Sequence, residues 1–188
     1  MRRGSFDKTQ AAGWGSARGA NVQGHRAHTM RRWIVAAVAL AGCKVGDSGY
    51  SGIGPYRVGH TKLKHARGRC EPTDLPDGRK GTWCYLNPTL GIAGRPADVD
   101  LYFLGTEPDA PVIEIQLQVR GCDEGGTKAW LQTSFGAPFV DSPTWSAWRN
   151  KHVYVIGELP SDPGRCLVRL LPRSEEAEFE RLKAKAKL

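Results

Sequence analysis

The clearest pattern along this chain of 188 residues lies in Val112–Arg120, where apolar and polar side chains alternate strictly from Ile113 onwards. The apolar positions of this stretch are Ile113, Ile115, Leu117 and Val119, and the polar positions between and after them are Glu114, Gln116, Gln118 and Arg120. A period of two places successive side chains on opposite faces of a strand. The pattern therefore predicts a strand that buries one face and exposes the other.

Further short apolar runs, separated by Gly, Pro and Asp, fill most of the chain after Cys70. We expect additional strands at 82–86, 99–104, 128–135, 152–156 and 166–171. The turn at 122–127 would make 128–135 the hairpin partner of Val112–Arg120. Many short strands without a long internal helix predict a mostly β protein, a compact antiparallel β-sandwich or barrel over residues 70–172.

Residues 173–188 carry a different pattern, which predicts a short C-terminal helix. Ser174 can cap its start, glutamates occupy the first turn and lysines the last, as the helix dipole favours. Phe179 and Leu182 supply only a small apolar stripe.

Near the start of the chain, Arg31 and Arg32 precede the apolar run Trp33–Ala41. A basic start followed by a short apolar core and small residues is the pattern of an export signal, and the run is far shorter than the ~20 residues of a membrane span. The run ends in Leu40-Ala41-Gly42-Cys43. This ending resembles the lipobox of bacterial lipoproteins.

The resemblance covers the signal segment alone and implies that residues 1–42 are a leader, with Met30 as an alternative start. It also implies that Cys43 is lipidated and becomes the mature N-terminus, so that the protein is anchored to a membrane of the cell envelope. Lys44 stands where an aspartate would favour inner-membrane retention, so the outer membrane is the expected location.

Residues 43–69 are rich in glycine and predict a tether between the anchor and the β-domain. Its part from Arg57 to Arg69 has five lysines and arginines, two histidines and no acid. A solvated linker or first strand is one interpretation, and a patch that lies against anionic lipid headgroups is the other.

The formal net charge of +8 invites a nucleic-acid partner, but the charge is unevenly distributed. Residues 1–42 hold seven of the lysines and arginines and one acid, so the remainder has twenty basic and eighteen acidic residues. A mature chain close to neutral gives no electrostatic argument for binding nucleic acid.

The four cysteines other than Cys43 are an even number in an exported domain, where disulfides persist. Of the three possible pairings we expect Cys70–Cys84 and Cys122–Cys166, because each would join neighbouring segments. Their spacing does not match a zinc site, and we predict no metal or other cofactor.

No motif of a hydrolase, metalloprotease or phosphate-binding loop is present in the sequence. The first hypothesis is therefore a non-enzymatic envelope lipoprotein with a structural or protein-binding β-domain. The second is a glycan-binding module, in which an exposed Trp130 and the amides of Gln132, Gln116 and Gln118 share one polar face; alternatively a loop or helix covers Trp130. The third is an enzyme with an unrecognised site, which a cleft of convergent ionisable groups would favour.

Overall fold

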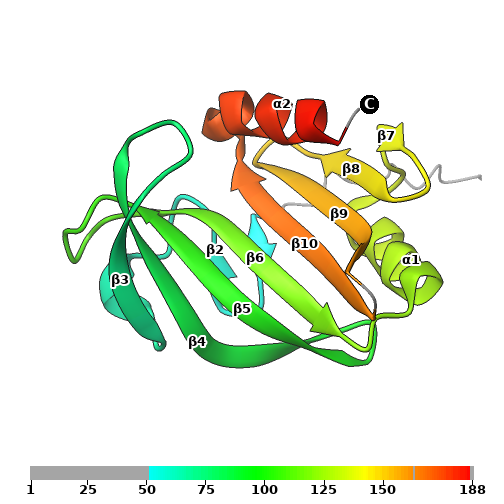
Figure 1. The fold of residues 1–188 in the computed structure, drawn as a ribbon, viewed down its shortest axis with the longest axis horizontal. Coiled ribbons are helices and arrows are strands. Elements are labelled where there is room, and N and C mark those ends of the chain that lie inside the picture. The colour runs from blue at the N-terminus through cyan, green and yellow to red at the C-terminus, as the bar shows by residue number, and fades with distance from the viewer. Residues whose placement is uncertain (1–50, 163, 187–188) are drawn as a thin grey trace, which may run out of the picture. The chain divides into compact units, whose positions relative to one another are not determined.

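The computed structural model describes residues 51–162 and 164–186, and its centre is an eight-stranded antiparallel sheet (Figure 1). The strands follow the order β3-β4-β5-β6-β10-β9-β8-β7. Their bounds are Arg69–Asp74 (β3), Lys80–Ile92 (β4), Arg95–Leu104 (β5), Val112–Arg120 (β6), Val140–Asp141 (β7), Trp145–Arg149 (β8), Val153–Asp162 (β9) and Arg165–Pro172 (β10). The predicted class, mostly β and antiparallel with a short C-terminal helix, is confirmed.

Strand β6 occupies the middle of the sheet and has the bounds that its alternation predicts. Ile115, Leu117 and Val119 are fully buried on one face, which we call the core face. Ile113 departs from the prediction, because the register between β5 and β6 shifts at this point. One extra residue on β6 turns Ile113 towards a cleft on the opposite face, as a bulge does.

The core face is covered by the N-terminal described segment and by helix α1 (Glu124–Phe135). The N-terminal segment forms the two-stranded sheet of β1 (Gly52–Ile53) and β2 (Tyr56–Arg57), followed by the 3-10 helix η1 (Leu63–His65). The predicted tether is therefore wrong for residues 51–69. Their apolar side chains at Ile53, Tyr56 and Val58 bury themselves in the core, which glycine content did not reveal.

The prediction of a strand at 128–135 is also wrong, since these residues form most of α1. Leu131 and Phe135 are four residues apart, a separation that fits both a strand and one face of a helix. Thr127 is buried four residues before Leu131, and Trp130 packs against the core beside them. The helical spacing buries this stripe against β9. The glycine-containing segment that was predicted as a hairpin turn is the first turn of α1, which begins at Glu124.

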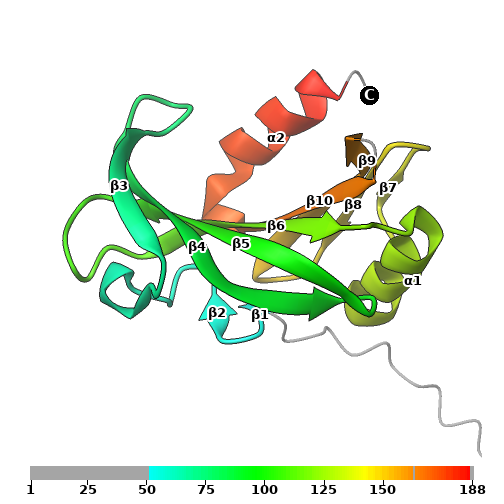
Figure 2. The ribbon, with the colours of Figure 1, turned by 60° about the horizontal axis from the view of Figure 1, so that its bottom comes forward.

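The opposite face of the sheet, which we call the open face, is only partly covered (Figure 2). A 3-10 turn η2 (Arg173–Glu175) leads into helix α2 (Glu176–Lys185), which lies over this face near β8, β9 and β10. Phe179 and Leu182 are buried there, and Phe179 stacks on Tyr154 with 4.3 Å between ring centroids. Ser174 lies within η2, and no side-chain hydrogen bond caps α2, so its predicted capping role is wrong.

Both expected disulfides are present. Cys70–Cys84 joins directly paired residues of β3 and β4, with 4.0 Å between the Cα atoms. Cys122–Cys166 joins the segment before α1 to β10, with 5.6 Å between the Cα atoms. The first disulfide cross-links β3 and β4 at one edge of the sheet, and the second attaches the start of α1 to β10.

Candidate functional site

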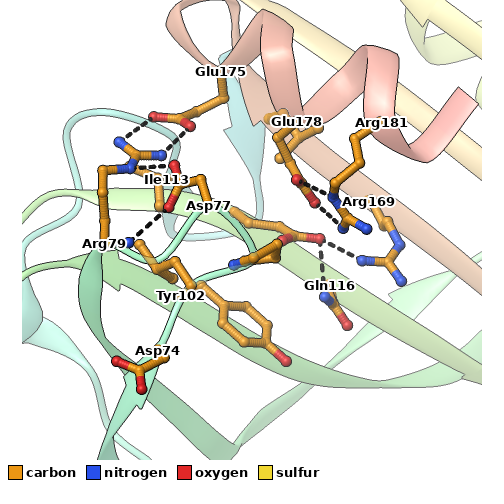
Figure 3. Close-up of a pocket in the computed structure, with 14 residues that line it drawn as sticks. Asp74, Asp77, Arg79, Tyr102, Ile113, Gln116, Arg169, Glu175, Glu178 and Arg181 are labelled. Atoms are coloured by element: carbon orange, nitrogen blue, oxygen red, sulfur yellow. Dashed lines mark hydrogen bonds and ion pairs between the residues drawn. The ribbon is translucent and has the colours of Figure 1, made fainter.

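A cleft of about 170 Å³ lies on the open face, between α2, the loop that joins β3 to β4, and strands β5, β6 and β10 (Figure 3). Its charged lining consists of Asp74, Asp77, Glu114, Glu175, Glu178, Arg79, Arg169 and Arg181. Tyr102 on β5 and Ile113 and Gln116 on β6 line the side of the cleft that the sheet forms. Alternation along β5 and β6 places Tyr102, Glu114 and Gln116 opposite the core, whereas the bulge in β6 brings Ile113 to the same face.

Glu114 is the most buried carboxylate of the cleft, with 7% of the residue exposed. Its Oε1 accepts hydrogen bonds from Arg169 Nη1 at 2.8 Å and from Gln116 Nε2 at 2.9 Å. Burial raises the pKa of Glu114 above its ordinary value, although Arg169 and Gln116 act to lower it. Arg169 also donates to Glu158 at 3.1 Å, and although burial alone would lower the pKa of Arg169, the two glutamates raise it.

The remaining cleft carboxylates are also ion-paired. Arg79, in the loop between β3 and β4, binds Glu175 in η2, with 3.1 Å between Nη1 and Oε1. It also binds Asp77 in the same loop. Glu178 pairs with Arg181 one turn along α2 at 2.6 Å, and Asp74 pairs with Lys80 at 2.6 Å. Figure 3 shows Glu175 extending towards Arg79 and Glu178 towards Arg181. Of these pairs, Arg79–Glu175 connects the turn before α2 to the loop between β3 and β4, whereas the other two lie within α2 and within the β3–β4 hairpin.

Beside the cleft, three aromatic rings from β4 and β5 form a row across the open face. Tyr85 and Trp83 are 4.6 Å apart between ring centroids, and Trp83 stacks on Tyr102 at 6.4 Å with an interplanar angle of 15°. We call Tyr85, Trp83 and Tyr102 the aromatic row. Burial, with Glu114 as the next contributor, raises the pKa of Tyr102 to about 12, so this phenol stays neutral.

Asp100 lies between Asp98 and Tyr102 on the same face of β5 and is half-buried. Burial raises the pKa of Asp100, the hydrogen-bond donor Trp83 acts to lower it, and the charge of Asp98 adds to the rise. Asp98 pairs with Arg120 at 2.6 Å, whereas Asp100 has no cation within ion-pair distance among residues 51–162 and 164–186. Asp100 is thus a half-buried carboxylate without a counter-charge, next to two aromatic rings.

The structure separates the residues that the sequence placed on one polar face. Gln116 and Gln118 do lie on the open face, half-buried, and Gln118 accepts a 3.4 Å hydrogen bond from Arg165. Trp130 and Gln132 lie on α1, on the core-face side. Trp130 packs against the core and meets Phe135 edge-on at 6.5 Å, so these four side chains form no common site. Cys43 lies outside the described residues.

The sequence reasoning missed Trp83, Tyr102 and Asp100 as site residues. A signal for two of them exists in β5, where Asp98, Asp100 and Tyr102 alternate with Val99, Leu101 and Phe103. Trp83 gave no such signal, because the buried residues on either side of it, Thr82 and Cys84, do not form an obvious apolar stripe in the sequence.

Comparisons with protein-family models, with curated proteins and with solved structures find no match to this chain. Within the part that the structure describes, no group of three or more His, Cys, Asp or Glu side chains is placed to hold a metal ion. None of the described helices has the length and apolar character that crossing a membrane requires.

Proposed function

We propose that the chain is an acyl-anchored lipoprotein of the cell envelope, held through Cys43 at the outer membrane. Its β-domain is a non-enzymatic binding domain, and the open face receives an extended, basic segment of another envelope protein. The observation that carries this proposal is Asp100, a half-buried carboxylate without a counter-charge beside the stacked rings of Trp83 and Tyr102.

A lysine or arginine side chain of the partner suits this position on two grounds. Its charge would balance Asp100, whose pKa burial has raised, and a charge-assisted hydrogen bond is about twice as strong as a neutral one. Its stem would lie along Trp83 and Tyr102, where a cation over an aromatic face gains about 0.5–2 kcal/mol.

Ionisable groups do converge in the cleft, which is the observation that favours the enzymatic alternative. Against it, each of the five cleft carboxylates already pairs with a lysine or arginine. Glu114 is fixed by Arg169 and Gln116, and Tyr102 holds its proton at neutral pH. Binding uses such a fixed arrangement as it stands, whereas proton transfer would first have to break it.

The test has two parts. Intact mass of the protein from its native host should show a chain that starts at Cys43 and carries lipid, and Cys43→Ser should abolish the lipid mass. Arrays of overlapping peptides from envelope proteins should then select basic segments. Asp100→Asn should weaken the selected binding about ten-fold, in line with the loss of a charged hydrogen bond and a cation contact.

The matched control is Asp98→Asn, two residues away on the same face, where the carboxylate already pairs with Arg120. This change should leave peptide binding within about two-fold of the wild type, since exposed pairs contribute little. Equal losses for both variants, or selection of acidic peptides, would contradict the proposed role of Asp100.

A glycan remains the second candidate ligand, because the aromatic row lies beside the amides of Gln116 and Gln118. Sugar rings stack on Trp and Tyr through their apolar faces, and amides bind their hydroxyl groups. An array of envelope glycans distinguishes the two candidates. Binding that Trp83→Ala abolishes but Asp100→Asn leaves intact would favour the glycan over the basic segment.

A further inference from the structure

A second groove lies on the core-face side of the domain, on the other side of the sheet from the cleft beside α2. It has a volume of about 370 Å³ and runs between the β1–β2 hairpin, η1 and β4. Arg67, His65, Tyr56 and Thr61 provide its polar lining, and Pro55, Pro88 and Leu90 its apolar lining. We propose that this groove binds the phosphate headgroup of an anionic lipid in the membrane to which Cys43 attaches the chain. The inference rests on the proposed lipid anchor, and it assigns a lipid ligand to a surface other than the open face.

Arg67 is the residue best suited to hold the phosphate. A guanidinium binds phosphate through two parallel hydrogen bonds, and Arg67 has no carboxylate within ion-pair distance in the described parts of the chain. Its charge reaches Tyr56, whose pKa is raised by burial and lowered in part by Arg67. The backbone is held in place, because the N–H groups of Arg67 and Gly68 donate to Asn87 Oδ1 at 3.2 and 3.0 Å.

The surroundings of the groove are also basic. Arg57 and Lys64 are exposed on the same segment, which has no acid from residue 57 to residue 69. The acid that approaches this segment is Asp109, which pairs with Lys64 at 2.6 Å and whose pKa is lowered by Lys64 first and by Lys62 and His65 as well. An anion that enters the groove therefore meets an excess of positive charge.

A membrane lipid fits the groove better than a free phosphate does, for two reasons. Pro55, Pro88 and Leu90 give the phosphate site an apolar border, which suits the glycerol and upper acyl region of a lipid. Ser51, the first described residue, follows Cys43 by eight residues. Eight extended residues span at most about 28 Å, so a lipid on Cys43 keeps the basic segment 57–69 close to the membrane surface.

This docking would also orient the binding domain. Figure 2 shows β1 and β2 on one side of the sheet and α2 on the other. With the groove against the headgroups, the open face with Trp83, Tyr102 and Asp100 turns away from the membrane. The surface proposed to bind another protein would then be the accessible one.

Amide hydrogen exchange of the lipid-anchored chain tests the inference. The purified protein is reconstituted in vesicles of phosphatidylcholine alone and in an equimolar mixture of phosphatidylcholine and phosphatidylglycerol. Because the anchor is the same in both, any difference reports the headgroup. Amides of residues 56–68 should exchange about five-fold more slowly on the anionic vesicles, the factor expected for one basic side chain at a charged surface, and high salt should remove the difference.

Arg67→Gln should abolish most of this protection, and His65→Gln serves if the first variant does not fold. Lys80→Gln, an exposed lysine at the β3–β4 loop, is the matched control and should keep the protection. Equal exchange on both vesicle types would overturn the inference. Equal slowing by inorganic phosphate in detergent would also overturn it, because the site would then belong to a free anion. The mass of the same sample reports the anchor separately: slow exchange on an unlipidated chain would support the groove while rejecting the lipidation of Cys43.

Discussion

Replacing Arg169 with methionine tests the central ion pair of the open face. Arg169 is the charged partner of Glu114, and Glu114 lies almost wholly inside the cleft. Methionine keeps much of the volume and apolar stem of arginine but removes the guanidinium. Glu158, the other partner, is 31% exposed in its side chain and can take up water when the arginine is removed.

The expected loss at neutral pH is about 3–5 kcal/mol, the cost of leaving one charge of a buried pair without its partner. The pH dependence has a definite sign. Burial raises the folded-state pKa of Glu114 above its ordinary 4.5, so between 4.5 and the folded value the folded chain holds more protons than the unfolded chain. Stability therefore falls as pH rises through this window and is greatest below it. Without Arg169 the folded pKa rises further, so the window widens and the loss at neutral pH grows.

Urea unfolding of the wild type and Arg169→Met at pH 4 and at pH 7 measures both effects. The cost of the substitution should be at least about 1 kcal/mol smaller at the acid pH, where protonated Glu114 needs no counter-charge. The double variant Glu114→Gln and Arg169→Met should recover most of the loss, because neither residue then leaves a buried charge. A loss below about 1 kcal/mol that is equal at both pH values would refute the reasoning, since that is the value of an exposed pair.

Three further predictions concern the fold. Ile115→Ala, at a fully buried core position, should cost about 2–5 kcal/mol of unfolding free energy, whereas Gln118→Ala on the open face should cost about 0.5 kcal/mol or less. Denaturant melts measure both values, and equal large losses would mean that both faces of β6 are buried. Leu86→Gly should stabilise the chain by up to about 1 kcal/mol, because Leu86 is 70% exposed at a φ of 55°, and thermal melts showing a loss would assign its side chain a packing role. Replacing Cys122 and Cys166 with serine should cost about 2–5 kcal/mol of unfolding free energy. Peptide mapping that finds both thiols free in the wild type would contradict this prediction.

The alternation of β6 predicted the central strand because one side chain in two meets the core along most of its length. Its failure at Ile113 has a local cause, a register shift against β5 that no property of the β6 sequence encodes. The helix at 124–135 was not predicted because its apolar spacing fits a strand as well as a helix. Leu131 and Phe135 satisfy both periods. The decision depends on Thr127, a polar residue that is fully buried one helical turn before Leu131 and that a hydrophobic pattern does not mark as buried.

The candidate site was harder to predict than the fold because its residues come together across strands. Gln116 was recognised as a polar position of β6, but its neighbours are Asp100 on β5 and Arg169 on β10, which cross-strand register places opposite it. Register in turn depends on bulges and on pairing partners far apart in the sequence. What distinguishes Asp100 from Asp98 is a missing counter-charge, because Arg120 reaches only the latter. A single strand pattern identifies both as polar, and only the assembled sheet separates a paired surface carboxylate from a half-buried one without a counter-charge.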